Sequence, residues 1–182
     1  MKKIKLLLLS IVIPFSISFG EYRVPALEKP IEDPSTGLLV PPGFKVDLIY
    51  EVDKKKFGSW ISMAFNKKGR LTVSDQQKAG TFLVEIPMSG EKFDESKIKK
   101  LNVESSVYGM LYAFDHLYMM GNRKLTRAKV LPDGSLGPVE FLAEMAGGGE
   151  HGPHSIIVSP DGKSIYVIAG NATRPPEFLN SR

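Results

Sequence analysis

The sequence predicts an all-β protein that forms part of a β-propeller. Three segments repeat one shape: an apolar run, a turn, and a second apolar run that ends in a small polar residue. Asp75, Asn122 and Asn171 mark this end at intervals of 47 and 49 residues. One four-stranded propeller blade takes roughly 40 to 50 residues. The three repeats run from Trp60 to Asp75, from Gly109 to Asn122 and from His154 to Asn171.

Alternation within the repeats favours strands over helices. Leu71 and Val73, and later Ile165 and Val167, alternate with their neighbours in short runs rich in β-branched and aromatic residues. Glycines in the turns between these runs supply the positive φ that tight turns need. The repeats therefore predict pairs of strands joined by short turns.

Two further runs alternate well enough to be outer strands of the blades. They are Thr81 to Ile86 and Leu125 to Leu131. A short charged stretch from Asp94 to Lys100 predicts one helical turn on the surface.

The number of repeats predicts an incomplete ring. A closed propeller has four to eight blades, and this chain has material for about three four-stranded blades of a six-bladed ring. Three blades leave two uncovered faces and an unpaired strand edge. We therefore expect the chain to be a fragment, the N-terminal half of a longer propeller domain.

Residues 1–20 have the pattern of an export signal. Lys2, Lys3 and Lys5 form a positive start, an apolar core follows, and small residues near Gly20 offer a cleavage site. The apolar core is too short for a stable membrane span. The sequence thus predicts an exported protein, periplasmic or extracellular, that is cleaved close to Gly20.

The charge balance argues against nucleic acid as a partner. The chain carries 24 Lys and Arg and 20 Asp and Glu, and the predicted signal holds three of the basic residues and none of the acidic ones. Without it, 21 basic residues stand against 20 acidic ones, so no strong positive charge remains to attract phosphates. The chain has no cysteine, so a lipoprotein anchor is excluded.

The domain organisation follows from where proline is frequent. Residues 21–42 contain five prolines and many charges, which predicts an arm or linker without regular structure. Gly43 to Val52 alternates apolar and polar residues and predicts a first strand. Residues 43–182 are then the propeller part of the chain.

The third repeat, HGPHSIIVSPDGKSIYVIAGN, together with PPGFKVDLIYE at the start of the domain, resembles the glucose/sorbosone dehydrogenase propellers. The resemblance is greatest to exported members that are often fused to a cytochrome c module, and it covers roughly residues 41–182. The soluble enzymes of the family use pyrroloquinoline quinone. The resemblance implies oxidation of a sugar or aldose, with this quinone and calcium as cofactors of the full-length protein, and haem only where a cytochrome module follows.

The resemblance also implies roles for four residues. It aligns His151 with the catalytic base of the family, and it implies cofactor contacts for His154, Asn171 and Arg174. Ser155 stands where arginine is usual, and Asn171 replaces an aspartate. A neutral imidazole is suited to take the hydroxyl proton as a sugar is oxidised. The other cofactor contacts, and any cytochrome partner, are expected outside this chain, with the missing C-terminal blades.

Other interpretations of these residues remain open. His151 and His154 are equally compatible with loop histidines that bond the backbone beside Gly147 to Gly149. Glu150 with the two histidines is a weak metal signal, because no distant fourth ligand is evident, and we predict no metal site in this chain. A second function class, a non-catalytic propeller that binds a partner or supports electron transfer, fits the same fold.

Overall fold

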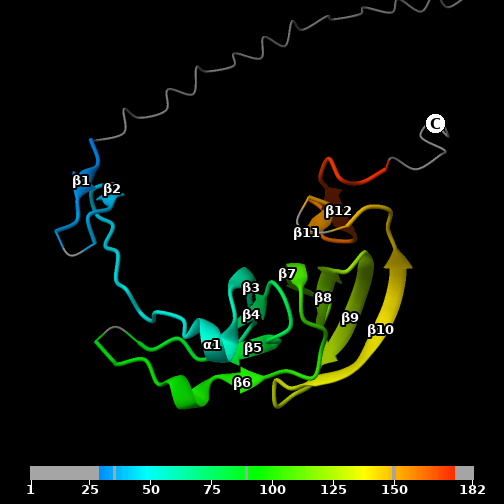
Figure 1. The fold of residues 1–182 in the computed structure, drawn as a ribbon, viewed down its shortest axis with the longest axis horizontal. Helices are drawn as coiled ribbons and strands as arrows, with labels where there is room; N and C mark the ends of the chain where they lie inside the picture. The colour runs from blue at the N-terminus through cyan, green and yellow to red at the C-terminus, as the bar shows by residue number, and fades with distance from the viewer. Residues whose placement is uncertain (1–28, 35, 89, 149–150, 175–182) are drawn as a thin grey trace, which may run out of the picture. The chain divides into compact units, whose positions relative to one another are not determined.

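The computed structural model describes residues 29–34, 36–88, 90–148 and 151–174, and its fold is drawn in Figure 1. The chain divides into two compact units, Met1–Asp47 and Leu48–Arg182. In the first unit, β1 (Ile31–Glu32) and β2 (Leu39–Val40) form an antiparallel hairpin. All other elements belong to the second unit. The predicted export signal lies outside the described residues.

The second unit is all-β, as predicted, with two four-stranded antiparallel sheets and one hairpin. The described part of each sheet is open, and none closes on itself. The first sheet contains β3 (Trp60–Phe65), β4 (Leu71–Asp75), β5 (Thr81–Val84) and β6 (Lys99–Lys100). The second contains β7 (Val107–Ala113), β8 (His116–Gly121), β9 (Lys124–Val130) and β10 (Leu136–Glu144). The hairpin contains β11 (Pro153–Val158) and β12 (Ile165–Ala169).

The two sheets and the hairpin stack face to face in chain order. The first strand of each lies beside the first strand of the next, so that β7 contacts β3 on one side and β11 on the other (Figure 1). A four-residue helix, α1 (Lys54–Phe57), precedes β3, and a 3-10 turn, η1 (Glu95–Lys97), precedes β6.

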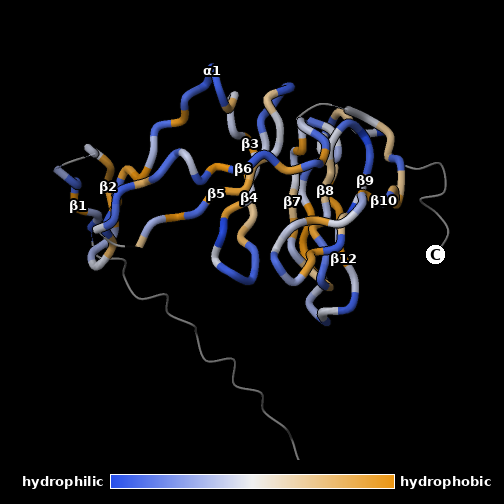
Figure 2. Tube along the Cα trace, turned by 90° about the horizontal axis from the view of Figure 1, so that it is seen from below, coloured by the Kyte–Doolittle hydropathy of each residue, from blue (hydrophilic) through white to orange (hydrophobic). Residues whose placement is uncertain are grey.

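The middle sheet is apolar on both faces because it is covered on both. Successive side chains of a strand point to opposite faces, so Met119 packs toward the first sheet while Met120 packs toward the hairpin. Both methionines are buried. Figure 2 shows the resulting apolar colouring along β7 and β8.

Hydrogen bonds tie the first sheet to the second. The Ser74 hydroxyl accepts from the Val107 amide at 3.1 Å, and the Ser62 hydroxyl donates to the Val107 carbonyl at 2.5 Å. The hydroxyls of Thr72 and Tyr112 lie 2.7 Å apart. Small polar residues in β3 and β4 thus let the two sheets approach closely and still satisfy buried hydroxyl groups.

Three predictions about individual segments need correction. Residues 43–52 form no strand in the structure, because alternation favours a strand only where a neighbour supplies its hydrogen bonds. The arm of residues 21–42 is not wholly irregular, since it contains the β1–β2 hairpin. The helical turn predicted over Asp94 to Lys100 is limited to Glu95–Lys97, and Lys99–Lys100 is a strand that pairs with β5.

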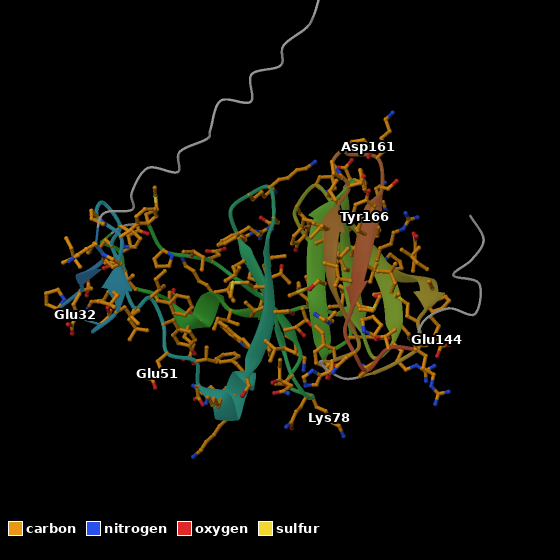
Figure 3. All side chains as sticks on the ribbon, turned by 90° about the horizontal axis from the view of Figure 1, so that it is seen from above. Glu32, Glu51, Lys78, Glu144, Asp161 and Tyr166 are labelled. Carbon is orange, nitrogen blue, oxygen red and sulfur yellow. The ribbon has the colours of Figure 1, made fainter. Side chains whose placement is uncertain are left out.

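The antiparallel order gives the stack two distinct ends. One end holds the beginnings of β3, β7 and β11 and the residues that follow β12; it is called the His151 end below. The opposite end holds the turns that join β3 to β4, β7 to β8, β9 to β10 and β11 to β12, and is called the turn end. Figure 3 shows Lys78 near the first end and Asp161 at the second.

Candidate functional site

His151 lies immediately before β11 and is held there by backbone contacts. Its carbonyl accepts a hydrogen bond from the Ala172 amide at 2.9 Å, and the Gly152 carbonyl accepts one from the Gly170 amide at 2.9 Å. These bonds extend the β11–β12 pairing beyond the strands. They place the His151 backbone beside the chain that leaves β12, which includes Asn171.

Glycines make this close approach of the two segments possible. A Cβ atom at Gly170 would lie 2.5 Å from the His151 carbonyl oxygen, and one at Gly152 would lie 2.7 Å from the Gly148 nitrogen. Gly147 has a φ of 97°, and a Cβ there would meet Ala172 and Thr173. Gly147 therefore packs against the turn after β12, and the close contacts explain why this position carries no side chain.

The four predicted site residues lie at one end but in different settings. His151, Asn171 and Arg174 are exposed, and Arg174 is the last residue before the undescribed end of the chain. His154 is half-buried in β11, and its ring Nδ1 lies 2.6 Å from the Gly152 carbonyl oxygen. A carbonyl only accepts, so Nδ1 carries the proton of this bond. The His154 ring thus has a structural bond, as the alternative interpretation predicts.

A buried hydroxyl beside this loop has no hydrogen-bond partner among the described residues. Thr173 Oγ1 is buried and has no hydrogen bond within the described part of the chain. Buried hydroxyls are normally satisfied. Its place in the turn after β12 marks the same surface that carries His151 and Asn171.

Asp75, the first of the recurring strand ends, has a structural role. Its side chain is 3% exposed. It accepts hydrogen bonds from the amides of Ser59, Gln77 and Ala79 at 2.7, 2.9 and 2.8 Å. Burial alone would raise the pKa of this carboxyl, but the amide bonds outweigh burial and hold the pKa below its ordinary value.

The other two recurring ends differ from Asp75. Asn122 has a φ of 48° and Arg123 a φ of 68°, the conformation of a tight hairpin turn between β8 and β9. Asn171 lies in an exposed turn after β12. The repeat in the sequence therefore marks the same position in each sheet, the end of its second strand. The side chains at this position have different roles in the three repeats.

The structure has a cavity at the turn end that the sequence did not predict. It has a volume of about 450 Å³ and lies where turns of the first and second sheets meet. His116 is half-buried in its wall, and its Nδ1 lies 2.6 Å from the Phe114 carbonyl oxygen. The residues come from three separate turns, β3–β4, β7–β8 and β9–β10, so no local pattern in the sequence could have indicated this site.

No group of three His, Cys, Asp or Glu side chains that could hold a metal ion occurs among residues 29–34, 36–88, 90–148 and 151–174. Within the same residues, no helix has the length and apolar character to cross a bilayer. Comparison with known proteins found no matching family model, no matching curated protein and no matching solved structure.

Proposed function

We propose that the chain is part of a β-propeller in which the first sheet, the second sheet and the hairpin are successive blades. The regular stacking of β3, β7 and β11 supports this proposal. Both outer faces of the stack also carry exposed apolar side chains, as a blade does when its neighbour is absent. They are Ile61, Met63 and Phe65 on β3, and Ile157, Tyr166 and Ile168 on the hairpin.

We further propose that the His151 end forms one wall of a site that oxidises a sugar or aldose in the complete propeller. The observation that carries this proposal is the paired backbone of His151 and Ala172, which fixes the histidine at the beginning of an inner strand while its side chain is exposed. In that position His151 would accept the hydroxyl proton of the sugar.

The described residues do not by themselves fit the cofactors that the family resemblance implies. An anionic quinone needs several cations, and calcium needs six to eight oxygen ligands. Near the turn after β12, the Arg123 guanidinium is already paired with Glu144 at 3.1 Å, and Arg174 is exposed. We therefore derive no step through pyrroloquinoline quinone, calcium or haem, and assign their binding to blades outside this chain.

The test compares two histidine variants of the full-length protein. With an aldose, pyrroloquinoline quinone, calcium and a dye acceptor, His151→Ala should lower the oxidation rate by about 10² to 10⁴-fold. His154→Ala should have a smaller effect, because its ring bonds the Gly152 backbone. Equal, small effects of both variants would contradict the catalytic role of His151.

The second candidate is a non-catalytic propeller that binds a partner or supports electron transfer. The structural hydrogen bond of His154 and the exposed apolar faces favour it. The absence of turnover with any aldose, combined with stable capture of a cytochrome c module by the full-length protein, would support this function instead.

The export proposal rests on residues 1–20 and has its own measurement. Mass spectrometry of periplasmic or secreted protein should find a new N-terminus close to Gly20, because the positive start and short apolar core match a cleaved signal. Recovery of cytoplasmic protein that retains Met1 would contradict the proposal.

A further inference from the structure

The cavity at the turn end has the size of a small-molecule site. Its volume of about 450 Å³ falls within the range of roughly 300 to 1,000 Å³ that is typical of ligand pockets. It lies at the opposite end of the stack from His151, so it is separate from the site proposed above. Its wall is formed by Asn66, Lys67, Lys68, Tyr112, Ala113, Asp115, His116, Lys129, Val130, Leu131, Pro132 and Gly134.

The interior of this cavity is mainly apolar. Tyr112, Val130, Leu131 and Pro132 provide a ring and aliphatic groups from the ends of β7 and β9. The Tyr112 hydroxyl is bonded to Thr72 at 2.7 Å, which fixes the direction of the ring. Burial raises the pKa of Tyr112 and keeps this hydroxyl protonated. A ligand must therefore present an apolar body to this wall.

The charged side chains around the cavity have a positive balance. The Lys67 ammonium pairs with the Asp115 carboxylate at 2.8 Å, so these two charges compensate each other. The Lys68 ammonium donates to the Pro132 carbonyl at 2.8 Å, which satisfies one proton but leaves the charge uncompensated. Lys129 makes no ion pair with any described residue.

A fourth cationic group, Arg70, lies just behind the wall. The Arg70 guanidinium is so close to Gly134 that a Cβ there would lie 1.8 Å from Nη2. Its Nε is buried and has no hydrogen-bond partner in the described part of the chain. This side chain adds to the positive potential at the cavity.

We propose that this cavity binds a small amphipathic anion, a carboxylate carried on an aromatic or short aliphatic body. The apolar wall takes the body, and Lys68 and Lys129 attract the carboxylate. Because the wall comes from turns of both sheets, the ligand also bridges the first sheet to the second. A neutral apolar molecule lacks the charge for the lysines, and a bare phosphate lacks the apolar body.

The proposal is tested on the full 182-residue chain with 4-phenylbutyrate as the probe. Titration followed by amide NMR should shift the signals of residues 112–116 and 129–134, with a Kd on the order of 1 mM for a ligand of this size. The neutral isostere 4-phenyl-1-butanol should bind about 5-fold more weakly, because exposed ion pairs contribute only modestly. Inorganic phosphate should produce no comparable shifts.

Two matched pairs of variants separate the cavity from the general surface. Lys129→Ala should weaken 4-phenylbutyrate binding about 3-fold, whereas Lys124→Ala, at the other end of the same strand, should leave binding unchanged. Leu131→Ser should weaken binding about 5-fold, whereas Leu142→Ser should not. The two leucines are 37% and 38% exposed, so both changes are tolerated similarly by the fold.

Several outcomes would overturn the proposal. Equal affinity for the acid and the alcohol would remove the role of the lysines. Equal effects of Lys129→Ala and Lys124→Ala would show that binding does not occur in the cavity, as would shifts confined to β11 and β12. None of these outcomes depends on sugar oxidation, so failure here is distinguishable from failure of the function proposed for the His151 end.

Discussion

Replacing Asp75 with asparagine removes the acceptor that holds the beginning of the first sheet together. In the structure one carboxylate oxygen accepts from Ser59, and the other accepts from both Gln77 and Ala79. An asparagine offers one oxygen and one amide group that only donates. Whichever way it is placed, at least one of these backbone amides loses its acceptor and faces another donor.

The expected cost follows from the number of bonds. A hydrogen bond to a charged group contributes about 1.5 to 3 kcal/mol, and an unsatisfied buried donor costs about 1 to 3 kcal/mol. Asp75→Asn should therefore lower the free energy of unfolding by about 3 kcal/mol and the Tm by roughly 10 °C. Asp161→Asn is the matched control, because Asp161 is exposed and bonds within a single turn. Its cost should be much smaller than that of Asp75→Asn.

The pH dependence gives a second test of the same reasoning. The pKa of Asp75 is lowered in the folded state, so its stabilising effect is fully present above the unfolded pKa of about 3.9. The effect is lost as the pH falls through the lower folded pKa. In urea unfolding followed by circular dichroism, the wild type and Asp75→Asn should differ by about 3 kcal/mol at pH 7 and converge toward pH 2. A difference below about 0.5 kcal/mol at pH 7, or one that does not depend on pH, would refute the account.

Three further predictions concern the contacts between the sheets and the exposed outer face of the hairpin. Gly109→Ala places a Cβ 1.8 Å from the His154 carbonyl oxygen and should lower the free energy of unfolding, measured by thermal unfolding, by about 3 kcal/mol. Gly137→Ala is the control: the contacts of a Cβ there begin at 3.6 Å, so the free energy of unfolding should change by less than about 0.5 kcal/mol. Tyr112→Phe leaves the Thr72 hydroxyl without its partner and should cost about 1 to 2 kcal/mol; a neutral result would contradict that bond. Tyr166 is 52% exposed on the outer face of the hairpin. The wild-type chain should therefore self-associate in light scattering, and Tyr166→Lys should reduce the association. A monodisperse wild-type monomer would count against an uncovered blade face.

Strand pairs within one repeat could be predicted because their signal is local. The structure has β4 ending at Asp75, as the repeat indicates, and β8 ends at Gly121, next to Asn122. The predicted outer strand over Leu125 to Leu131 corresponds to β9, shifted by one residue. Alternation and turn chemistry act over a few residues, so a single sequence carries them.

Features that depend on a distant partner could not be predicted in the same way. Residues 43–52 alternate as a strand does, yet they pair with no strand in the described structure. In contrast, the proline-rich arm contains a hairpin because Asp33 accepts from Thr36, and Gly37, with a φ of 68°, completes the turn. In the arm, local turn chemistry produces a hairpin despite the many prolines. In residues 43–52, alternation produces no strand because no neighbouring strand pairs with them in the described structure.

The two candidate sites differ in the same way: one depends on local structure and the other on segments that are distant in the sequence. The closeness of the His151 backbone to the turn after β12 follows from hairpin register, which is a local feature of the chain. The cavity at the turn end brings together Lys68, Tyr112 and Lys129, which lie far apart in the chain. Only the stacking of two sheets creates that cavity, and stacking has no local signature in the sequence.

At the His151 end the backbone is held by hydrogen bonds while the imidazole is exposed, and this contrast affects the chemistry that the end can support. Paired amides and close glycines hold His151 against the chain after β12, whereas the imidazole side is exposed and the hairpin carries only two described strands. A general base needs its substrate positioned within hydrogen-bond reach. Under the proposal of an axial site, those positioning contacts would come from another blade across the site. If the full-length protein oxidises a sugar, variants in blades beyond this chain should impair turnover at least as much as Asn171→Ala does. If only residues of this chain affect turnover, the site is not axial and the propeller arrangement is wrong.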